Sequence, residues 1–219
     1  FSIGFNMVLV PASVSTLGKA GPEGVNMTVT DESDDKLFRR CVVNNTVYDY
    51  ISRCNIDGLG IAPPPGGLRL WILNSMNTDS AVMLHHGAIL RNDLMESFLG
   101  KYSSILEFFL PDITIGTKDS STYKEIYSDT CHELSHASHF VQVGTDYWDT
   151  YIRYIMESYV TSGGELYGGG TGAGSGHCEV SEMWGWYLES KLIKQRYGGA
   201  LPEIGTSWWF YPQIFRFMD

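Results

Sequence analysis

Apolar and polar residues between about 123 and 143 alternate with the period of a helix and predict one there. Thr122 and Glu125 have the spacing of a capping box at its start. Gly144 is a fitting stop at its end, because glycine readily takes the left-handed conformation that closes many helices. The pattern therefore predicts a helix with defined ends.

Two more helices are predicted downstream. The first covers about residues 146–159, with Thr145 as its cap and apolar residues at every third or fourth position. The second covers about residues 178–196 and ends at a glycine pair. Eight glycines between Gly163 and Gly176 separate these two helices and predict a loop.

Shorter patterns precede these helices. "LRLWIL", residues 68–73, has the composition of a buried strand, and "SAVMLHH", residues 80–86, is a second candidate. "PDITIG", residues 111–116, alternates as a strand does, and Pro111 at its start favours an edge position in a sheet. The segment 92–109 suits a helix with one break.

Residues 1–67 are predicted to form a β-rich N-terminal region. Short β-prone runs occur near its start, and residues 41–54 could form two strands around Asn44 and Asn45. The break "APPPGG", residues 62–67, is the candidate boundary to a second region that covers residues 68–219. Fold class α+β follows from this order of elements.

Composition narrows the classes of partner. The chain has 219 residues, 43% hydrophobic and 18% charged, which supports a packed core. The net charge of −10, without a lysine or arginine block, argues against nucleic acid as a partner. No apolar run is long enough for a transmembrane helix. The chain starts at Phe1, so it is expected to be processed, trimmed or incompletely represented. It stops inside an apolar segment, so the natural protein is expected to continue past Asp219.

The four cysteines leave two interpretations open. An even number permits two disulfides, of which Cys41–Cys54 and Cys131–Cys178 are the simplest pairing. Four buried thiols are the alternative. The possible disulfides, the start at phenylalanine and the acidic composition together favour an exported protein: periplasmic, cell-surface or extracellular.

The sequence "HELSH" carries the strongest chemical signal. His132 and His136 are four residues apart and share one face of the first predicted helix, so both imidazoles can reach one metal ion. Glu133 follows about 100° around the helix, where it can act on a water bound to that metal. A chance match to this pattern in a chain of this length is roughly a one-per-cent event. We therefore interpret this segment as a metal site.

A catalytic zinc ion needs a third protein ligand and one open position. His139 lies two turns from His132, so it is expected to be a surface histidine or to support a ligand. Glu182 and Glu179 are better candidates, since both are acidic residues near the start of the third predicted helix. Glu182 is preferred because it precedes the apolar run "MWGW", where a carboxylate is costly unless it is paired or binds a metal.

With "HELSH" and "EMWGWYLE" together, the chain resembles the gluzincins, zincin-fold peptidases whose third ligand is a glutamate on a following helix. It also resembles uncharacterised secreted bacterial zincin-like proteins. Over residues 68–219 the resemblance implies a mixed sheet above the "HELSH" helix, with His132, His136 and Glu182 binding Zn²⁺ and Glu133 acting as the general base. The metzincin extension is absent, because His139 and Gln142 occupy the positions of its glycine and third histidine.

One position departs from the gluzincin pattern. Many gluzincins carry an aspartate four residues after the ligand glutamate, and Trp186 stands there in this chain. Glu179 or Asp129 could orient the first histidine instead.

No residue is assigned as the group that stabilises an oxyanion. Tyr167 and His177 are the nearest candidates, with ordinary loop positions as the alternative for both. The aromatic run at residues 208–211 could stack on sugars, although packing in a core or interface is its commoner use.

The function predicted from these residues is zinc-dependent hydrolysis of peptide bonds in a peptide or protein substrate. The strand near Ile113–Ile115 is expected to pair with an extended substrate if it lies at the edge of the sheet. The alternative is a non-catalytic surface binding or assembly module with a structural or vestigial zinc site.

Overall fold

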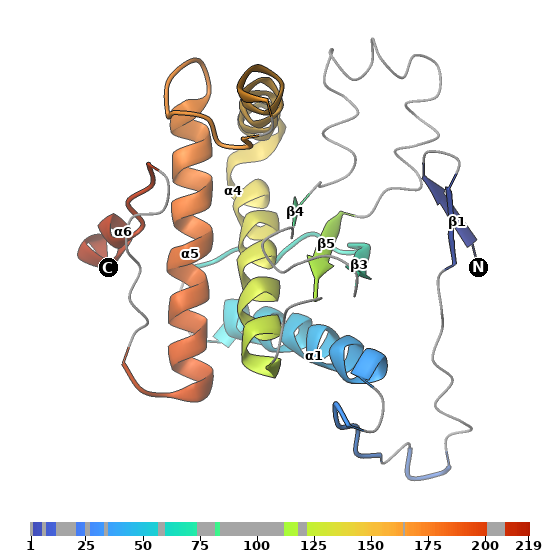
Figure 1. Ribbon diagram of the computed structural model, residues 1–219. Helices are drawn as coiled ribbons and strands as arrows, with labels where there is room; N and C mark the ends of the chain where they lie inside the picture. Colours follow the sequence, from blue (N-terminus) through green and yellow to red (C-terminus); the bar gives the residue numbers. More distant parts are fainter. Residues whose placement is uncertain are drawn as a thin grey trace.

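Helices dominate the fold, and a small sheet completes an α+β arrangement (Figure 1). The computed structural model describes residues 2–5, 8–11, 21–24, 27–32, 35–56, 60–73, 82–83, 112–117, 122–163, 165–200 and 209–219. The predicted helix over residues 92–109 lies outside them. Among the described helices, none combines the length and the apolar character needed to cross a membrane.

Helix α4, Tyr123–Ser162, is two helical segments joined at a kink. Thr122 and Glu125 form the capping box at its start, as predicted. The backbone leaves helical geometry at Gly144, where φ is 79° and ψ is −179°, so the predicted break is confirmed. A left-handed Gly163 ends the second segment.

Helix α5, Ser175–Tyr197, returns alongside α4 in the opposite direction (Figure 1). It ends at Gly198, as predicted, and begins three residues earlier than predicted. The glycine-rich segment joins the two helices. The "HELSH" helix and the helix that carries Glu182 are therefore direct neighbours.

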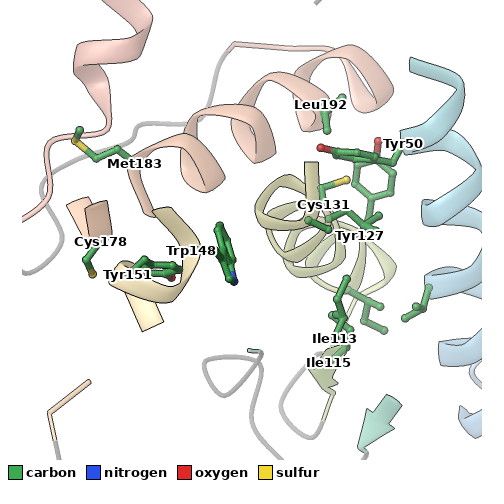
Figure 2. Packing of buried hydrophobic residues seen from close by; sticks show 14 of the residues in the cluster. Tyr50, Ile113, Ile115, Tyr127, Cys131, Trp148, Tyr151, Cys178, Met183 and Leu192 are labelled. Atoms are coloured by element: carbon green, nitrogen blue, oxygen red, sulfur yellow. The ribbon is translucent and has the colours of Figure 1, made fainter. Parts of the chain in front are cut away.

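Helix α1, Asp35–Ile56, corrects the prediction of two strands around Asn44 and Asn45. It packs across α4: Tyr50 donates a hydrogen bond to Ser138 (2.9 Å), and Asp49 accepts one from Tyr127 (2.7 Å). Figure 2 shows Tyr50 facing Cys131 and Tyr127 of α4. A helix, rather than strands, is thus the main described element of residues 1–67, and it shares one apolar core with the later helices.

The strands form two separate sheets. Strands β1, Ser2–Phe5, and β2, Val8–Pro11, make an antiparallel hairpin. The second sheet has the order β3-β5-β4, with β3 at Leu70–Leu73, β4 at Val82–Met83 and β5 at Ile113–Gly116. Strand β5 is parallel to β3 and antiparallel to β4, so the sheet is mixed, as predicted.

The edge position predicted for residues 111–116 is wrong, because β5 is the central strand. All four residues of β5 are buried, as in a strand covered on both faces. A proline before the first residue of a strand leaves the ladder that follows intact, so Pro111 did not require an edge. Pairing of a substrate along β5, as expected from the sequence, has no support in this arrangement.

All four cysteines are free thiols. Cys41 and Cys54 both lie on α1, where thirteen positions at 1.5 Å each separate them by roughly 20 Å, too far for a disulfide. Cys131 and Cys178 are fully buried thiols, while Cys41 and Cys54 are half-buried. The disulfide pairing, one of the two interpretations left open, is therefore wrong, and export of the protein loses that support and stays a prediction.

Candidate metal centre

The two histidines of "HELSH" face each other on the first segment of α4. Their Nε2 atoms are 3.1 Å apart, and their rings meet edge to face with centroids separated by 4.7 Å. The helical spacing predicted this proximity, since residues four apart are neighbours on a helix surface. His136 is almost fully buried, and His132 is partly buried.

Glu182 brings a carboxylate from α5 to the same point. Its Oε2 atom lies 3.5 Å from the Nε2 of His132 and 3.7 Å from the Nε2 of His136. Its other oxygen accepts a hydrogen bond of 2.5 Å from Tyr151, which follows the kink in α4. The carboxylate is thus oriented, with one oxygen held by a phenol and the other directed at the two imidazoles.

Three donor atoms therefore form a triangle with sides of 3.1, 3.5 and 3.7 Å. Ligands at about 2.0–2.1 Å from a tetrahedral zinc ion lie roughly 3.3–3.4 Å from one another. The triangle fits a metal ion of this size. The sequence-based choice of Glu182 over Glu179 agrees with this geometry.

Glu133 also reaches the centre, with an oxygen within 4.8 Å of the ligand atoms of His132 and His136. It is 5% exposed, and its Oε2 has no hydrogen-bond partner. Burial raises the pKa of its carboxyl to about 8; His132 opposes this rise, and the negative charge of Glu182 adds to it. Because Glu182 completes the triangle from the opposing helix, Glu133 is a second carboxyl group beside it.

Glu189 orients His132 and was missed by sequence reasoning. Its Oε2 lies 3.2 Å from the Nδ1 of His132, and its Oε1 accepts a hydrogen bond from Ser128. The sequence had suggested Glu179 or Asp129 for this role. Glu189 follows Glu182 by two helical turns, so the seven-residue spacing of two glutamates on one helix face was the available signal.

Gly185 makes room for the first histidine. A Cβ atom at this position would lie 2.8 Å from Cε1 and 2.9 Å from Nε2 of His132. Trp186, the next residue, has its ring centroid 6.1 Å from that of His132. The "MWGW" run therefore contributes space as well as apolar cover, since any larger residue at 185 would displace the imidazole.

His139 is not a surface residue, which corrects one expectation from the sequence. It is 6% exposed, and its Nδ1 lies 3.3 Å from the hydroxyl of Ser181. The rings of Tyr147 and Trp148 pack against it. Burial lowers its pKa to about 4, so it is neutral at pH 7. Trp148 is in ring contact with both His139 and the ligand His136.

The two candidates for an oxyanion-stabilising group, Tyr167 and His177, lie in different surroundings. Burial raises the pKa of the Tyr167 phenol, and the negative charges of Glu182 and Glu133 raise it further, which indicates that the phenol lies near the metal centre. His177 instead stacks on Tyr147 at 4.3 Å, and its carbonyl accepts a hydrogen bond from the Tyr147 hydroxyl. The structure thus brings Tyr167, and not His177, to the candidate site.

The ionisable groups of the centre differ in the direction in which their pKa values are shifted. Burial alone would lower the pKa of His132, but Glu182 and Glu189 raise it well above 6.5. Burial lowers the pKa of His136 to about 3, so that ring is neutral at pH 7. Burial would raise the pKa of Glu182, but the neighbouring histidines lower it. A cation bound here would replace the proton of His132.

Comparisons with protein-family models, curated proteins and solved structures found no match to this chain.

Proposed function

We propose that the protein is a zinc-dependent hydrolase of peptide bonds. The observation that carries this proposal is the triangle of His132 Nε2, His136 Nε2 and Glu182 Oε2, whose sides suit three ligands of one tetrahedral ion. The order of an "HELSH" helix followed by a helix with the third ligand is that of the gluzincins, and a zincin-like fold is part of the proposal.

Two of the three ligands have a partner that fits this role, while Nδ1 of His136 is buried without a hydrogen bond to any described residue. Glu189 fixes the ring of His132, and Tyr151 fixes the carboxylate of Glu182. Such contacts set the orientation of metal ligands in proteins and raise their basicity. A zinc ion bound here would polarise the carbonyl of the substrate and lower the pKa of a water toward ~7.

Glu133 would act as general base. One of its oxygens has no hydrogen-bond partner among the described residues, and its carboxylate lies within 4.8 Å of the ligand atoms of both histidines, where it could accept a proton from the attacking water and pass it to the leaving amine. A cation in the centre would lower the pKa of this carboxyl from about 8 toward neutrality. That value suits a group that must both accept and release a proton near pH 7.

A structural zinc site in a binding or assembly module is the second candidate. It is favoured by burial, because Glu133, His136 and Glu182 are only 3–5% exposed. A structural site, however, is closed by four ligands and needs no base. The three-ligand triangle and the unpartnered Glu133 oxygen favour the enzyme.

The test has two stages. Elemental analysis of the purified chain should give one zinc ion per molecule, and His132→Ala combined with His136→Ala should abolish binding. Stoichiometric zinc in that double variant would refute the ligand assignment.

In the second stage, wild-type and Glu133→Gln proteins are assayed on a broad peptide library. We expect Glu133→Gln to keep zinc and lose turnover by roughly 10²–10⁴-fold. Zinc-loaded wild-type protein that cleaves nothing would favour the binding module. Equal cleavage by both proteins would refute the role of Glu133.

A further inference from the structure

Two aromatic residues of α4 that contact the metal centre follow the kink at Gly144. The ring centroid of Trp148 lies 6.1 Å from that of the ligand His136, and the ring centroid of Tyr151 lies 6.3 Å from it. In a continuous α-helix, positions 136 and 148 would be about 18 Å apart along the axis, and positions 136 and 151 about 22 Å. Both contacts therefore exist because the backbone turns at Gly144.

Trp148 packs in the angle between the two segments of α4. It is fully buried, and its ring centroid lies 5.9 Å from that of Phe140 in the first segment and 4.9 Å from that of Tyr151 in the second. Figure 2 shows the ring between Tyr151 and the segment that carries Cys131. Its indole N–H has no hydrogen-bond partner within the described part of the chain, so packing accounts for its burial.

The second segment of α4 is also fixed against the start of α5, the helix that carries Glu182. A Cβ atom on Gly174 would lie 2.9 Å from the carbonyl oxygen of Thr150, so the two backbones are in direct contact. Tyr151 lies on this segment and donates its hydrogen bond of 2.5 Å to Glu182. The kink thus places one segment of α4 at the histidines and the other at the carboxylate.

We propose that Trp148 is a positioning residue of the metal centre and that the kink at Gly144 is the backbone feature on which it depends. Trp148 holds the ring of His136 directly. Through Tyr151 it also holds the carboxylate of Glu182. This inference rests on the proposed zinc site but not on peptidase activity, because its first effect is on the orientation of two ligands.

Gly144→Ala tests the kink. At Gly144 φ is 79° and ψ is −179°, a conformation that residues with a side chain avoid, while an added Cβ would meet nothing within 4 Å. The substitution therefore acts on the backbone angle and not on packing. Competition with a chelator should show that zinc binding by the full chain is weakened at least ~10-fold, since the partners of two ligands are displaced together.

Gly198→Ala is the matched control. Gly198 ends α5 with φ of 71° and ψ of −168°, and a Cβ there would also meet nothing within 4 Å. Both substitutions should therefore lower the unfolding temperature of the metal-free protein through the same kind of backbone strain. Only Gly144→Ala should lower zinc affinity, whereas a purely structural role of the kink would leave zinc affinity equal in the two variants.

Two substitutions at Trp148 test the ring itself. Trp148→Leu should weaken zinc binding by ~10–100-fold, the range expected when a residue that orients a ligand is lost. Trp148→Phe keeps an aromatic ring against His136 and Tyr151, so it should restore most of the affinity that Trp148→Leu loses. Should Trp148→Leu fail to fold, Gly144→Ala and Gly198→Ala carry the test, since neither removes a buried side chain.

Equal zinc affinity in Gly144→Ala and Gly198→Ala would overturn the inference, as would wild-type affinity in Trp148→Leu. A loss as large in Trp148→Phe as in Trp148→Leu would also overturn it, because ring packing would then not be the cause. A wild-type chain that binds zinc but cleaves no peptide would refute the proposed activity and leave the positioning role standing if the affinities follow the expected order. A wild-type chain without zinc would overturn both.

Discussion

The carboxyl group of Glu133 should make the metal-free protein less stable as the pH rises. In the folded chain its pKa is about 8, mainly because of burial, while an exposed glutamate ionises near 4.5. Between these values the unfolded chain has released the proton that the folded chain still holds, so the free energy of unfolding falls with pH. Below about pH 4.5 and above about pH 8 this contribution is constant.

Glu133→Gln removes this penalty, because the amide cannot ionise. The interval from 4.5 to about 8, at about 1.36 kcal/mol per pH unit, sets an upper limit of about 5 kcal/mol. Relaxation around the charge will reduce the measured value. For a protein of this size, a gain of even about 2 kcal/mol would raise Tm by roughly 4–8 °C.

The assay is thermal unfolding of chelator-treated wild-type and Glu133→Gln proteins at pH 5 and at pH 9. The variant should exceed the wild type clearly at pH 9 and only slightly at pH 5. Zinc should shrink the difference, since a divalent cation beside Glu133 stabilises the ionised carboxylate. Glu179→Gln, a half-buried glutamate outside the ligand triangle, is the control. Equal gains at both pH values would show a packing effect and refute the electrostatic explanation.

Three further outcomes are expected. Gly185→Ala should weaken zinc binding at least ~10-fold in a chelator titration, because its Cβ would lie 2.8 Å from the first ligand histidine. Gly176→Ala on the same helix is the control: its Cβ would meet nothing within 4 Å, and its zinc affinity should equal that of the wild type. Tyr151→Phe should lower zinc affinity by ~10–100-fold through loss of its hydrogen bond to Glu182. Unchanged affinity would show that this hydrogen bond does not contribute to zinc binding. In acid unfolding experiments, His139→Asn should reduce the loss of stability between pH 6.5 and about 4 by at most ~3 kcal/mol. Burial lowers the pKa of the wild-type ring to about 4, so over this range the unfolded chain binds a proton that the folded chain does not.

The parts of the site that sequence predicts are those set by local spacing. The cap at Thr122, the break at Gly144 and the shared face of His132 and His136 all depend on residues within a few positions of one another. Glu182 was found because a carboxylate in an apolar run needs a partner, which is again a local observation.

Contacts between elements were harder to predict. Residues 41–54 are rich in β-branched and aromatic residues, which favoured strands, yet the buried positions Val43, Thr46 and Tyr50 follow a helical spacing. That spacing only becomes decisive once the tertiary core is known. The central place of β5 and the contact of Phe210 with Tyr167 depend on packing between distant segments, for which no short pattern exists.

The ligand triangle joins two helices that are far apart along the chain. A metal ion held by His136 and Glu182 would close a loop of roughly 46 residues, which acts on the unfolded ensemble as a removable cross-link. By the chain-entropy relation for disulfides, closing a loop of this length is worth about 4 kcal/mol, provided the ion stays bound in the unfolded chain. In a chain whose cysteines are all unbridged, a zinc ion would be the one cross-link among the described residues, and it would add to the packing of α4 against α5 in the shared core.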